Sequence, residues 1–155
     1  MELLCPLNLP PYPFQITERN NKFFLFDEIR KKTLLITPEE WVRQHFIQYL
    51  ILQKKYPKSL IQLEGGLKLN GQSKRSDILI FNSRGEKILL VECKAPSVKI
   101  TQAAFDQIAR YNIVHRVPLL AVTNGLEHFY CQIDFEQEKY FFVDKLPDYE
   151  DLSPK

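Results

Sequence analysis

Three charged residues near the middle of the chain have the types and the spacing that metal-assisted hydrolysis needs. Asp77 opens the apolar run DILIF, and Glu92 and Lys94 stand near the end of a second run, KILLVECKA. Two carboxylates suit Mg²⁺, which commonly binds through one or two carboxylates, several waters and the phosphate oxygens of a substrate. Such a metal activates a water and stabilises charge developing on phosphorus, and an ammonium group orients that water or stabilises the same charge.

A β-hairpin would bring these three residues together. Alternate residues of a strand share a face, so Glu92 and Lys94 point the same way while Cys93 points to the opposite side, into the core. A two-residue loop at Arg84-Gly85, or a four-residue loop with the same centre, sets a register that pairs Asp77 with Glu92. Directly opposed residues have Cβ atoms about 4.5–5.5 Å apart. The spacing therefore predicts two facing carboxylates with an ammonium two residues along.

The same spacing also fits two structural interpretations. One is a salt bridge at a strand end, because charge pairs in sheets are usually solvated and structural. The other is a register that slips by one residue and puts the carboxylates on opposite faces. Spacing alone leaves both alternatives open.

The elements around the hairpin indicate the α/β class. Residues 15–36 are strand-rich, and Thr37 to about Lys55 forms a helix in which Thr37 is the N-cap and Pro38 the first helical position. We then expect a strand over LIQLEGGLKL, the hairpin, a helix from Thr101 to His115, and the strand PLLAVTN, which leads into a turn at Asn124-Gly125 and the further strand runs EHFYCQID and KYFFVD. An order of helix, three strands, helix and strand is typical of α/β folds.

One side of the first helix carries its apolar residues, which on a helical wheel are Val42, Phe46, Ile47, Tyr49 and Leu50. Glu39 falls near the middle of this stripe and Glu40 toward its edge. An acid that points inward needs a partner, because burying it alone is costly. Trp41 falls opposite the stripe, so we expect it to be an exposed contact or to be covered by the N-terminal segment.

Length and composition fit a soluble globular domain. The 155 residues are 45% hydrophobic and 26% charged, and predict one domain over 1–155 with a Pro-rich arm at about 1–14 and a short polar C-terminal tail. The net charge of +2 provides no global basic field for a passive nucleic-acid binder. No CxxC pair, signal peptide or apolar run of roughly 18–20 residues is present, so we expect a reducing, cytoplasmic setting and no membrane.

Several blocks of the sequence resemble a known family of nucleases. RSD at 75–77 followed by VECKAP at 91–96 resembles the PD-(D/E)xK signature, with 92–94 as its ExK element and Ser76 in place of the proline. The blocks TPEEWVRQHFIQYL, KRSDILIF, ILLVECKAP, FDQIARYN and AVTNGLEHF resemble the nuclease-like N-terminal domain of type I restriction enzyme R subunits. The resemblance covers about residues 34–132.

The resemblance implies a restriction-endonuclease-like core, with a central mixed β-sheet flanked by helices, and roles for individual residues. Asp77 and Glu92 would be ligands of Mg²⁺, for which Mn²⁺ can substitute, and Lys94 the catalytic lysine. An inward glutamate of the first helix would be a further metal ligand. Glu39 and Glu40 are both candidates, and the wheel and the spacing to Arg43 favour Glu39.

A second helix would complete the implied site. Gln107 and Tyr111 match the family's QxxxY element, and at i and i+4 they share one helix face. Gln107 would then approach the site or the nucleic-acid backbone. Ordinary helix packing, with Tyr111 in the core, is an equal alternative for this pair.

Three functions remain open at this point. The first is an endonuclease that hydrolyses nucleic acid, with DNA expected, acting as a homodimer or within a larger restriction-type complex. The second is a nuclease-fold module without independent activity that binds nucleic acid in such a complex, since the chain lacks the GxxxxGK[ST] motif of an ATP-driven motor. The third is an interaction protein in which the polar cluster is an ion-pair network. A shared fold cannot separate them.

Overall fold

A six-stranded mixed sheet organises the chain, in the order β11-β10-β9-β8-β7-β4. The computed structural model describes residues 4–63, 68–69, 72–73 and 77–152, and the side chains of 68–69, 72–73 and Asp77 lie outside the description. The main sheet consists of β4 (Ile61–Leu63), β7 (Asp77–Phe81), β8 (Lys87–Cys93), β9 (Leu119–Thr123), β10 (His128–Asp134) and β11 (Lys139–Val143). Only β8 and β9 run parallel; the other neighbours are antiparallel.

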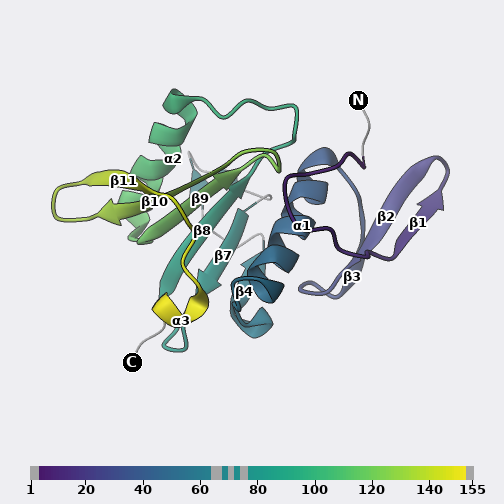
Figure 1. The fold of residues 1–155 in the computed structure, drawn as a ribbon, viewed down its shortest axis with the longest axis horizontal. Helices are drawn as coiled ribbons and strands as arrows, with labels where there is room; N and C mark the ends of the chain where they lie inside the picture. The colour runs from purple at the N-terminus through teal and green to yellow at the C-terminus, as the bar shows by residue number, and fades with distance from the viewer. Residues whose placement is uncertain (1–3, 64–67, 70–71, 74–76, 153–155) are drawn as a thin grey trace.

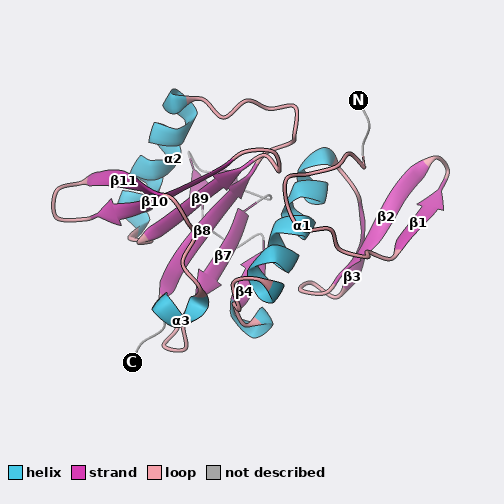
Figure 2. Ribbon diagram, viewed as in Figure 1, coloured by secondary structure: helices cyan, strands magenta, loops and turns pink. Residues whose placement is uncertain are grey.

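Helices cover the two faces of this sheet, with α1 (Pro38–Leu52) on one and α2 (Gln102–His115) on the other, as Figures 1 and 2 show. A 3-10 turn (Lys58–Leu60) precedes β4, a short pair of strands, β5 (Lys68–Leu69) and β6 (Gln72–Ser73), precedes β7, and a short helix, α3 (Tyr149–Leu152), closes the described chain. The predicted mixed α/β class is confirmed, and the main sheet follows the predicted order of helix, three strands, helix and strand. The strand predicted over LIQLEGGLKL is described only as β4 and β5, because residues 64–67 lie outside the description. No helix among the described residues is long and apolar enough to cross a membrane.

A separate three-stranded antiparallel sheet precedes α1, as the strand-rich pattern of residues 15–36 predicts. It consists of β1 (Ile16–Arg19), β2 (Lys22–Asp27) and β3 (Lys32–Leu35), with β2 in the middle. Figure 1 shows α1 between this sheet and the main one. All residues from Glu40 to Gln48 are therefore buried, polar ones included.

The N-cap of α1 is the one expected, since the Thr37 hydroxyl accepts a hydrogen bond of 3.1 Å from the Glu40 backbone N–H. Trp41 is covered by the N-terminal arm: its indole N–H donates to the Cys5 carbonyl at 2.9 Å, and its ring packs against Phe14 and His45. The expected covering by the arm is confirmed, and the alternative of an exposed contact is wrong.

The hairpin of β7 and β8 has the predicted register at its far end, where Asp77 pairs with Glu92. Near the loop the prediction is wrong, because Phe81 pairs with Lys87 and the register shifts between Ile80 and Phe81. The loop closes on Asn82, whose side-chain oxygen accepts from the backbone N–H groups of residues 84 and 86 at 2.9 and 3.0 Å. The shift adds one residue on β8, which restores the register beyond it.

Alternation along β8 separates two apolar cores. Val91 and Cys93 belong to the core beneath α1, while Leu90 belongs to the core beneath α2. The predicted core position of Cys93 is confirmed, with 1% of the residue exposed. By the same alternation, Glu92 and Lys94 lie on the α2 side of the sheet.

The N-terminal arm also fastens the end of β9, next to β8. The Asn8 backbone N–H donates to the Gly125 carbonyl at 2.7 Å, and His128 Nε2 donates to the Asn8 carbonyl at 2.8 Å. The other ring nitrogen of His128 lies 2.7 Å from the Thr123 hydroxyl, and the Thr123 carbonyl accepts from the Lys94 backbone N–H at 2.8 Å. A continuous set of hydrogen bonds thus joins the arm to the strand end that carries Lys94.

Two glycines with positive φ provide a matched test of this fastening. A methyl group on Gly125 (φ 86°) would lie 2.8 Å from the Leu7 side chain, whereas one on Gly85 (φ 77°) would meet nothing within 4 Å. We expect Gly85→Ala to cost about 1–2 kcal/mol from backbone strain alone. Gly125→Ala should cost about 1–3 kcal/mol more, because the Leu7 side chain, packed beside Val42, must move out of the way. Urea unfolding of the two variants measures the difference, and equal losses would contradict the tight contact.

Candidate functional site

Glu92 and Lys94 form an ion pair at the end of the central strand β8. The Lys94 ammonium lies 3.3 Å from a Glu92 carboxylate oxygen, with 4% of the Glu92 side chain and 31% of the Lys94 side chain exposed. Glu92 pairs across the sheet with Asp77 on β7 and with Val122 on β9. The hairpin therefore brings residues 77, 92 and 94 together along the backbone as predicted.

The burial of Glu92 determines what this pair can do. An ionised carboxylate that loses water is costly unless a charge or hydrogen bonds compensate for it, and Lys94 supplies such a charge. The ammonium group is itself partly open to solvent, so it can meet an incoming anion while it remains beside the carboxylate. A carboxylate and an ammonium group held in this way can offer an incoming anion a fixed positive charge.

The predicted metal site extends beyond the side chains that the structure describes. Within the described residues, no group of three or more His, Cys, Asp or Glu side chains is placed to hold a metal ion. The Asp77 carboxylate and residues 74–76, which carry the start of the RSD motif, are outside the description. The assignment of Asp77 and Glu92 as ligands therefore stays a prediction that the register permits.

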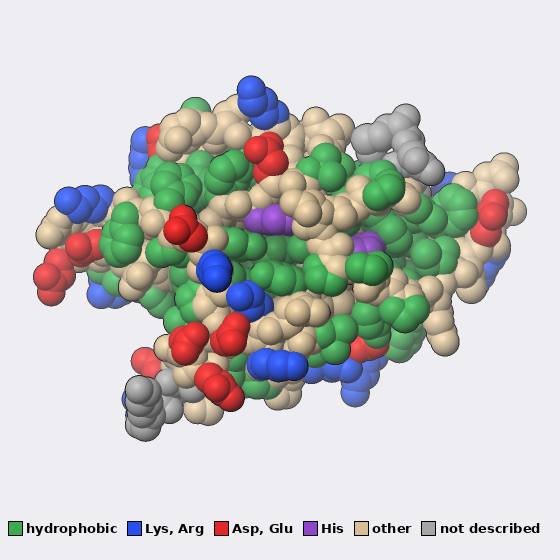
Figure 3. Space-filling model, viewed as in Figure 1, with side chains coloured by type: hydrophobic (Ala, Val, Ile, Leu, Met, Phe, Trp, Pro, Cys, Tyr) green, Lys and Arg blue, Asp and Glu red, His purple; other side chains and the backbone are tan. Residues whose placement is uncertain are grey.

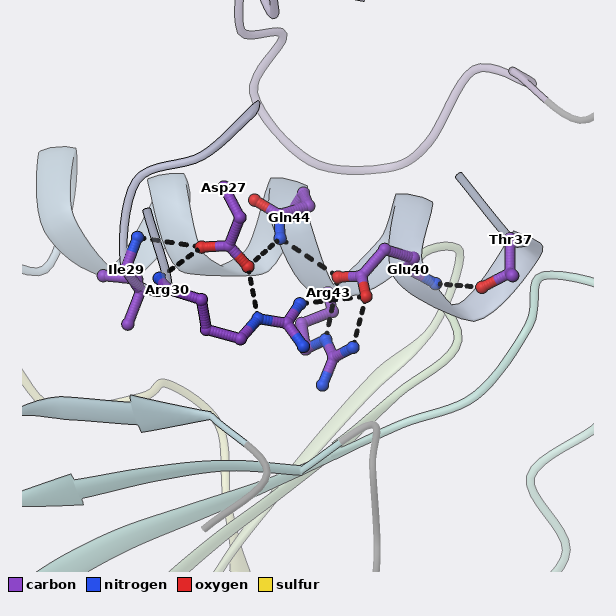
Figure 4. Close-up of polar contacts among 7 residues, drawn as sticks. All are labelled: Asp27, Ile29, Arg30, Thr37, Glu40, Arg43 and Gln44. Carbon is purple, nitrogen blue, oxygen red and sulfur yellow. Dashed lines mark hydrogen bonds and ion pairs between the residues drawn. The ribbon is translucent and has the colours of Figure 1, made fainter. Parts of the chain in front are cut away.

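A second cluster of buried charges lies at the start of α1, and we call it the Asp27–Glu40 network (Figure 4). Its members are Asp27, Arg30, Glu40, Arg43 and Gln44. The Glu40 carboxylate accepts hydrogen bonds from Arg30 and Gln44 at 3.0 Å each and forms an ion pair with Arg43. Asp27 accepts from the Arg30 side chain at 2.7 Å and from Gln44 at 3.0 Å. The network joins β2 and the following turn to the first turns of α1.

The structure corrects the expected orientation of the two helix glutamates. Glu39 is exposed and Glu40 is buried, so the inward position predicted for Glu39 is wrong. The wheel treated the apolar stripe as the only buried side of α1, whereas the N-terminal sheet and arm bury the other sides too. Glu40 is stabilised there by Arg30, a partner that no helical pattern reveals. The i, i+3 spacing of Asp27 with Arg30 and of Glu40 with Arg43 is the available sequence signal.

The surroundings of the two buried acids shift their pKa values. Burial alone would raise the pKa of Asp27, but hydrogen bonds from the backbone and side chain of Arg30, with its charge, lower it below the usual value. Burial likewise opposes the lowered pKa of Glu40, and the hydrogen bonds and charge of Arg43, with help from Gln44 and Arg30, outweigh it. Both groups are therefore held as carboxylates in the folded protein.

The QxxxY pair divides between the surface and the core. Gln107 is exposed on α2, whereas Tyr111 is 9% exposed, belongs to the core beneath that helix and lies with its ring 4.2 Å from that of His115. The core alternative for Tyr111 is confirmed. Gln107 remains accessible to a ligand, and its predicted role near the site stays a prediction.

A polar contact beside this helix escaped the sequence analysis. On α2, Gln102 lies 2.9 Å from both Asp106 and the Tyr140 hydroxyl, and that hydroxyl also donates to Asp106. Desolvation and the neighbouring Asp106 raise the pKa of Tyr140 to about 12. These hydrogen bonds link α2 to the edge strand β11. In the sequence, only the spacing of four residues between Gln102 and Asp106 indicates such a contact.

The fold and the paired charges define a mixed α/β protein with an acid and a lysine adjoining at the end of a central strand. The family model for the N terminus of type I restriction enzyme R proteins matches residues 38–147, well over half of the chain. The chain belongs to this family, as the sequence resemblance predicted. Comparison with curated proteins and with solved structures found no match.

The Asp27–Glu40 network predicts acid sensitivity. Because the folded-state pKa values are lowered, the network's stabilisation is fully present above the unfolded values, about 4, and is lost as the pH falls through the lower folded values. We expect Glu40→Gln to weaken this dependence below pH 4. The variant should also lose about 3 kcal/mol at pH 7, because the buried Arg43 loses the Glu40 carboxylate, although Arg30 keeps that of Asp27.

Glu39→Gln is the matched control, because its exposed side chain should change stability by less than about 0.5 kcal/mol. Urea unfolding from pH 3 to pH 7 measures both variants. Identical curves for the two would show that the network contributes nothing specific.

Proposed function

We propose that this chain is a metal-dependent endonuclease with a restriction-endonuclease-like core that hydrolyses DNA phosphodiester bonds in a restriction-related setting. The observation that carries the proposal is the end of the β7–β8 hairpin. There Asp77 pairs with Glu92, and the Lys94 ammonium lies 3.3 Å from the Glu92 carboxylate. Membership in the R protein N-terminus family supports the restriction-related setting.

The residues at this strand end fit a hard divalent cation by the chemistry of their donors. The carboxylates of Asp77 and Glu92 would hold Mg²⁺, or Mn²⁺ in its place, because such ions prefer oxygen ligands. When bound, the ion supplies an activated water and offsets negative charge on the phosphate. Lys94 would contribute a positive charge beside the reacting phosphate, fixed by its contact with Glu92.

Neither helix glutamate is part of this proposed metal site. Glu39 is exposed, and the carboxylate oxygens of Glu40 already accept hydrogen bonds from Arg30, Arg43 and Gln44. We assign Glu40 instead to fixing α1 against the preceding strands. Gln107 is exposed on the helix that covers the Glu92 side of the sheet, and we propose that it contacts the nucleic-acid backbone.

A partner-dependent module is the second candidate, and the burial of Glu92 favours it. With 3% of this residue exposed, a substrate reaches the carboxylate only if neighbouring groups move aside, which a partner in a restriction-type complex could bring about. In that case the chain binds DNA by itself and cleaves only in the complex. The endonuclease proposal also includes a cytoplasmic setting and a homodimer, which would supply two sites for cutting both strands.

A nicking assay tests the endonuclease. Purified chain with Mg²⁺ or Mn²⁺ should convert supercoiled plasmid to the nicked form, and Lys94→Ala and Glu92→Gln should each lower the rate about 100-fold or more. Lys99→Ala is the matched control, since Lys99 is exposed five residues farther along the same segment. If all variants nick at the wild-type rate, the activity comes from a contaminant.

A binding measurement separates the two candidates. DNA affinity that is unchanged in Glu92→Gln, together with no cleavage by the wild type under either metal, favours the partner-dependent module. A calorimetric titration that shows no binding of Mg²⁺ or Mn²⁺ to the free chain would count against the independent endonuclease. If the chain also fails to bind DNA, the partner-dependent module is removed as well, in favour of a structural ion pair.

A further inference from the structure

The β1–β3 sheet has an outer face, opposite the side that carries Leu25 and Asp27, and alternation along its strands identifies the residues of that face. At one edge of it Phe26 lines a hollow with Glu28 and with Gln48 of α1. On β2, Leu25 and Asp27 are 1% and 0% exposed and point inward, so Phe24 and Phe26 point outward. The strand register adds their neighbours. We call this set the outer face: Thr17, Arg19, Lys22, Phe24, Phe26, Thr33 and Leu35.

The composition of the outer face is unusual for a solvent-facing surface. It consists of two cations, two hydroxyl groups and three apolar side chains, and no member of the set is an acid. Phe26 is 49% exposed and Leu35 is 43% exposed. The Arg19 guanidinium lies over the Phe24 ring, 5.7 Å from its centroid. Figure 3 shows hydrophobic side chains at the surface over this part of the molecule.

The charges around the outer face add to its positive character. Lys31 and Lys32 are exposed in and after the turn between β2 and β3. Two of the nearby acids are already bound to cations, since Asp27 pairs with Arg30 and Glu28 pairs with Lys58 at 2.7 Å. A third, Glu18 on β1, is exposed, and the strand register places it on the opposite side from Thr17 and Arg19. An anion that approaches the outer face therefore meets mainly Arg19, Lys22 and the turn lysines.

We propose that the outer face binds a single-stranded segment of nucleic acid. Bases stack on exposed aromatic rings without regard to sequence, and Arg and Lys beside such rings follow the phosphates. Phe24 and Phe26 are two residues apart on one strand, hence about 6.8 Å, twice the 3.4 Å spacing of stacked bases. Phe26 offers the more exposed ring for a base of a strand that is spread open, while Phe24 is half-buried and shares its ring face with Arg19. A paired duplex keeps its base faces covered.

The outer face is separate from the site at Glu92 and Lys94, and it lies outside the residues that the family model matches. The β1–β3 sheet precedes residue 38, where the match begins, and it lies across α1 from the main sheet (Figure 1). The inference rests on the proposed function in one respect, because that function makes nucleic acid the partner. The outer face would then hold a displaced or unpaired strand rather than the bond that is cut.

Binding of a fluorescent 20-nucleotide oligo(dT), followed by anisotropy with EDTA present, tests the stacking. We expect Phe26→Ala to weaken binding about tenfold and Phe26→Tyr, which keeps an aromatic ring, to bind like the wild type. Phe141→Ala is the matched control, since Phe141 is also 49% exposed but lies on β11 of the main sheet. Equal affinities of Phe26→Ala and Phe141→Ala, or no loss in Phe26→Ala while Phe26→Tyr folds normally, overturn the proposal.

The salt dependence tests the phosphate contacts. Replacing Arg19 and Lys22 together by Gln should lower the slope of log affinity against log salt by about 1.4, because each single-strand phosphate contact contributes about 0.7. Lys139→Gln on β11 should leave the slope unchanged. A preference for duplex over oligo(dT), or a change of oligomeric state in Phe26→Ala with unaltered oligo(dT) affinity, overturns the single-strand assignment.

The two proposals fail separately. Lys94→Ala should keep wild-type affinity for oligo(dT) even where it abolishes nicking. Binding that depends on Phe26 in a chain that never cleaves supports the outer face and removes the endonuclease. Nicking by a chain whose oligo(dT) affinity is the same in Phe26→Ala and Phe141→Ala supports the endonuclease and removes the outer face.

Discussion

The double burial of β8 is the constraint on which the rest of the structure depends. This strand is hydrogen-bonded on both edges, antiparallel to β7 and parallel to β9, and apolar cores lie on both of its faces. A strand so enclosed has no solvent for a charged side chain, so Glu92 requires a compensating group, and Lys94 emerges just where the enclosure ends. The parallel neighbour β9 also requires a crossover, which α2 supplies over the Glu92 side of the sheet.

The central hairpin could be predicted because two simple rules act on it. Period-two alternation and pairing about a loop centre place Asp77 opposite Glu92, and both rules hold at that end of the strands. They miss the irregularity beside Phe81, because it depends on how the Asn82 side chain bonds to the loop backbone. The prediction survives only because the extra residue on β8 and the asymmetric loop compensate for each other.

The helix acid could not be predicted in the same way. A helical wheel ranks positions by one apolar stripe, but α1 is enclosed by the main sheet, the β1–β3 sheet and the arm, so its polar side is interior too. Which glutamate is buried then depends on Arg30, which precedes Glu40 by ten residues and lies in the turn after β2. The burial of Trp41 is likewise set by tertiary structure, because the N-terminal arm covers its side chain. The N-cap Thr37 and the limits of the second helix depend on neighbouring residues and were predicted closely, whereas α1 ends at Leu52 and not at about Lys55.

The hydrogen bonds between the N-terminal arm and the β9–β10 turn affect how the chain folds while it is being synthesised. Asn8 and His128 are 120 positions apart, so the arm leaves the ribosome long before the turn that receives it exists. Until His128 emerges, Leu7 and the arm side of α1 lack part of their final packing, and closing such a distant contact is entropically slow. In the interval between the two events the nascent chain exposes this apolar surface. Because β11 and the buried Leu146 follow His128 in the chain, the contact forms late but before the last packing step.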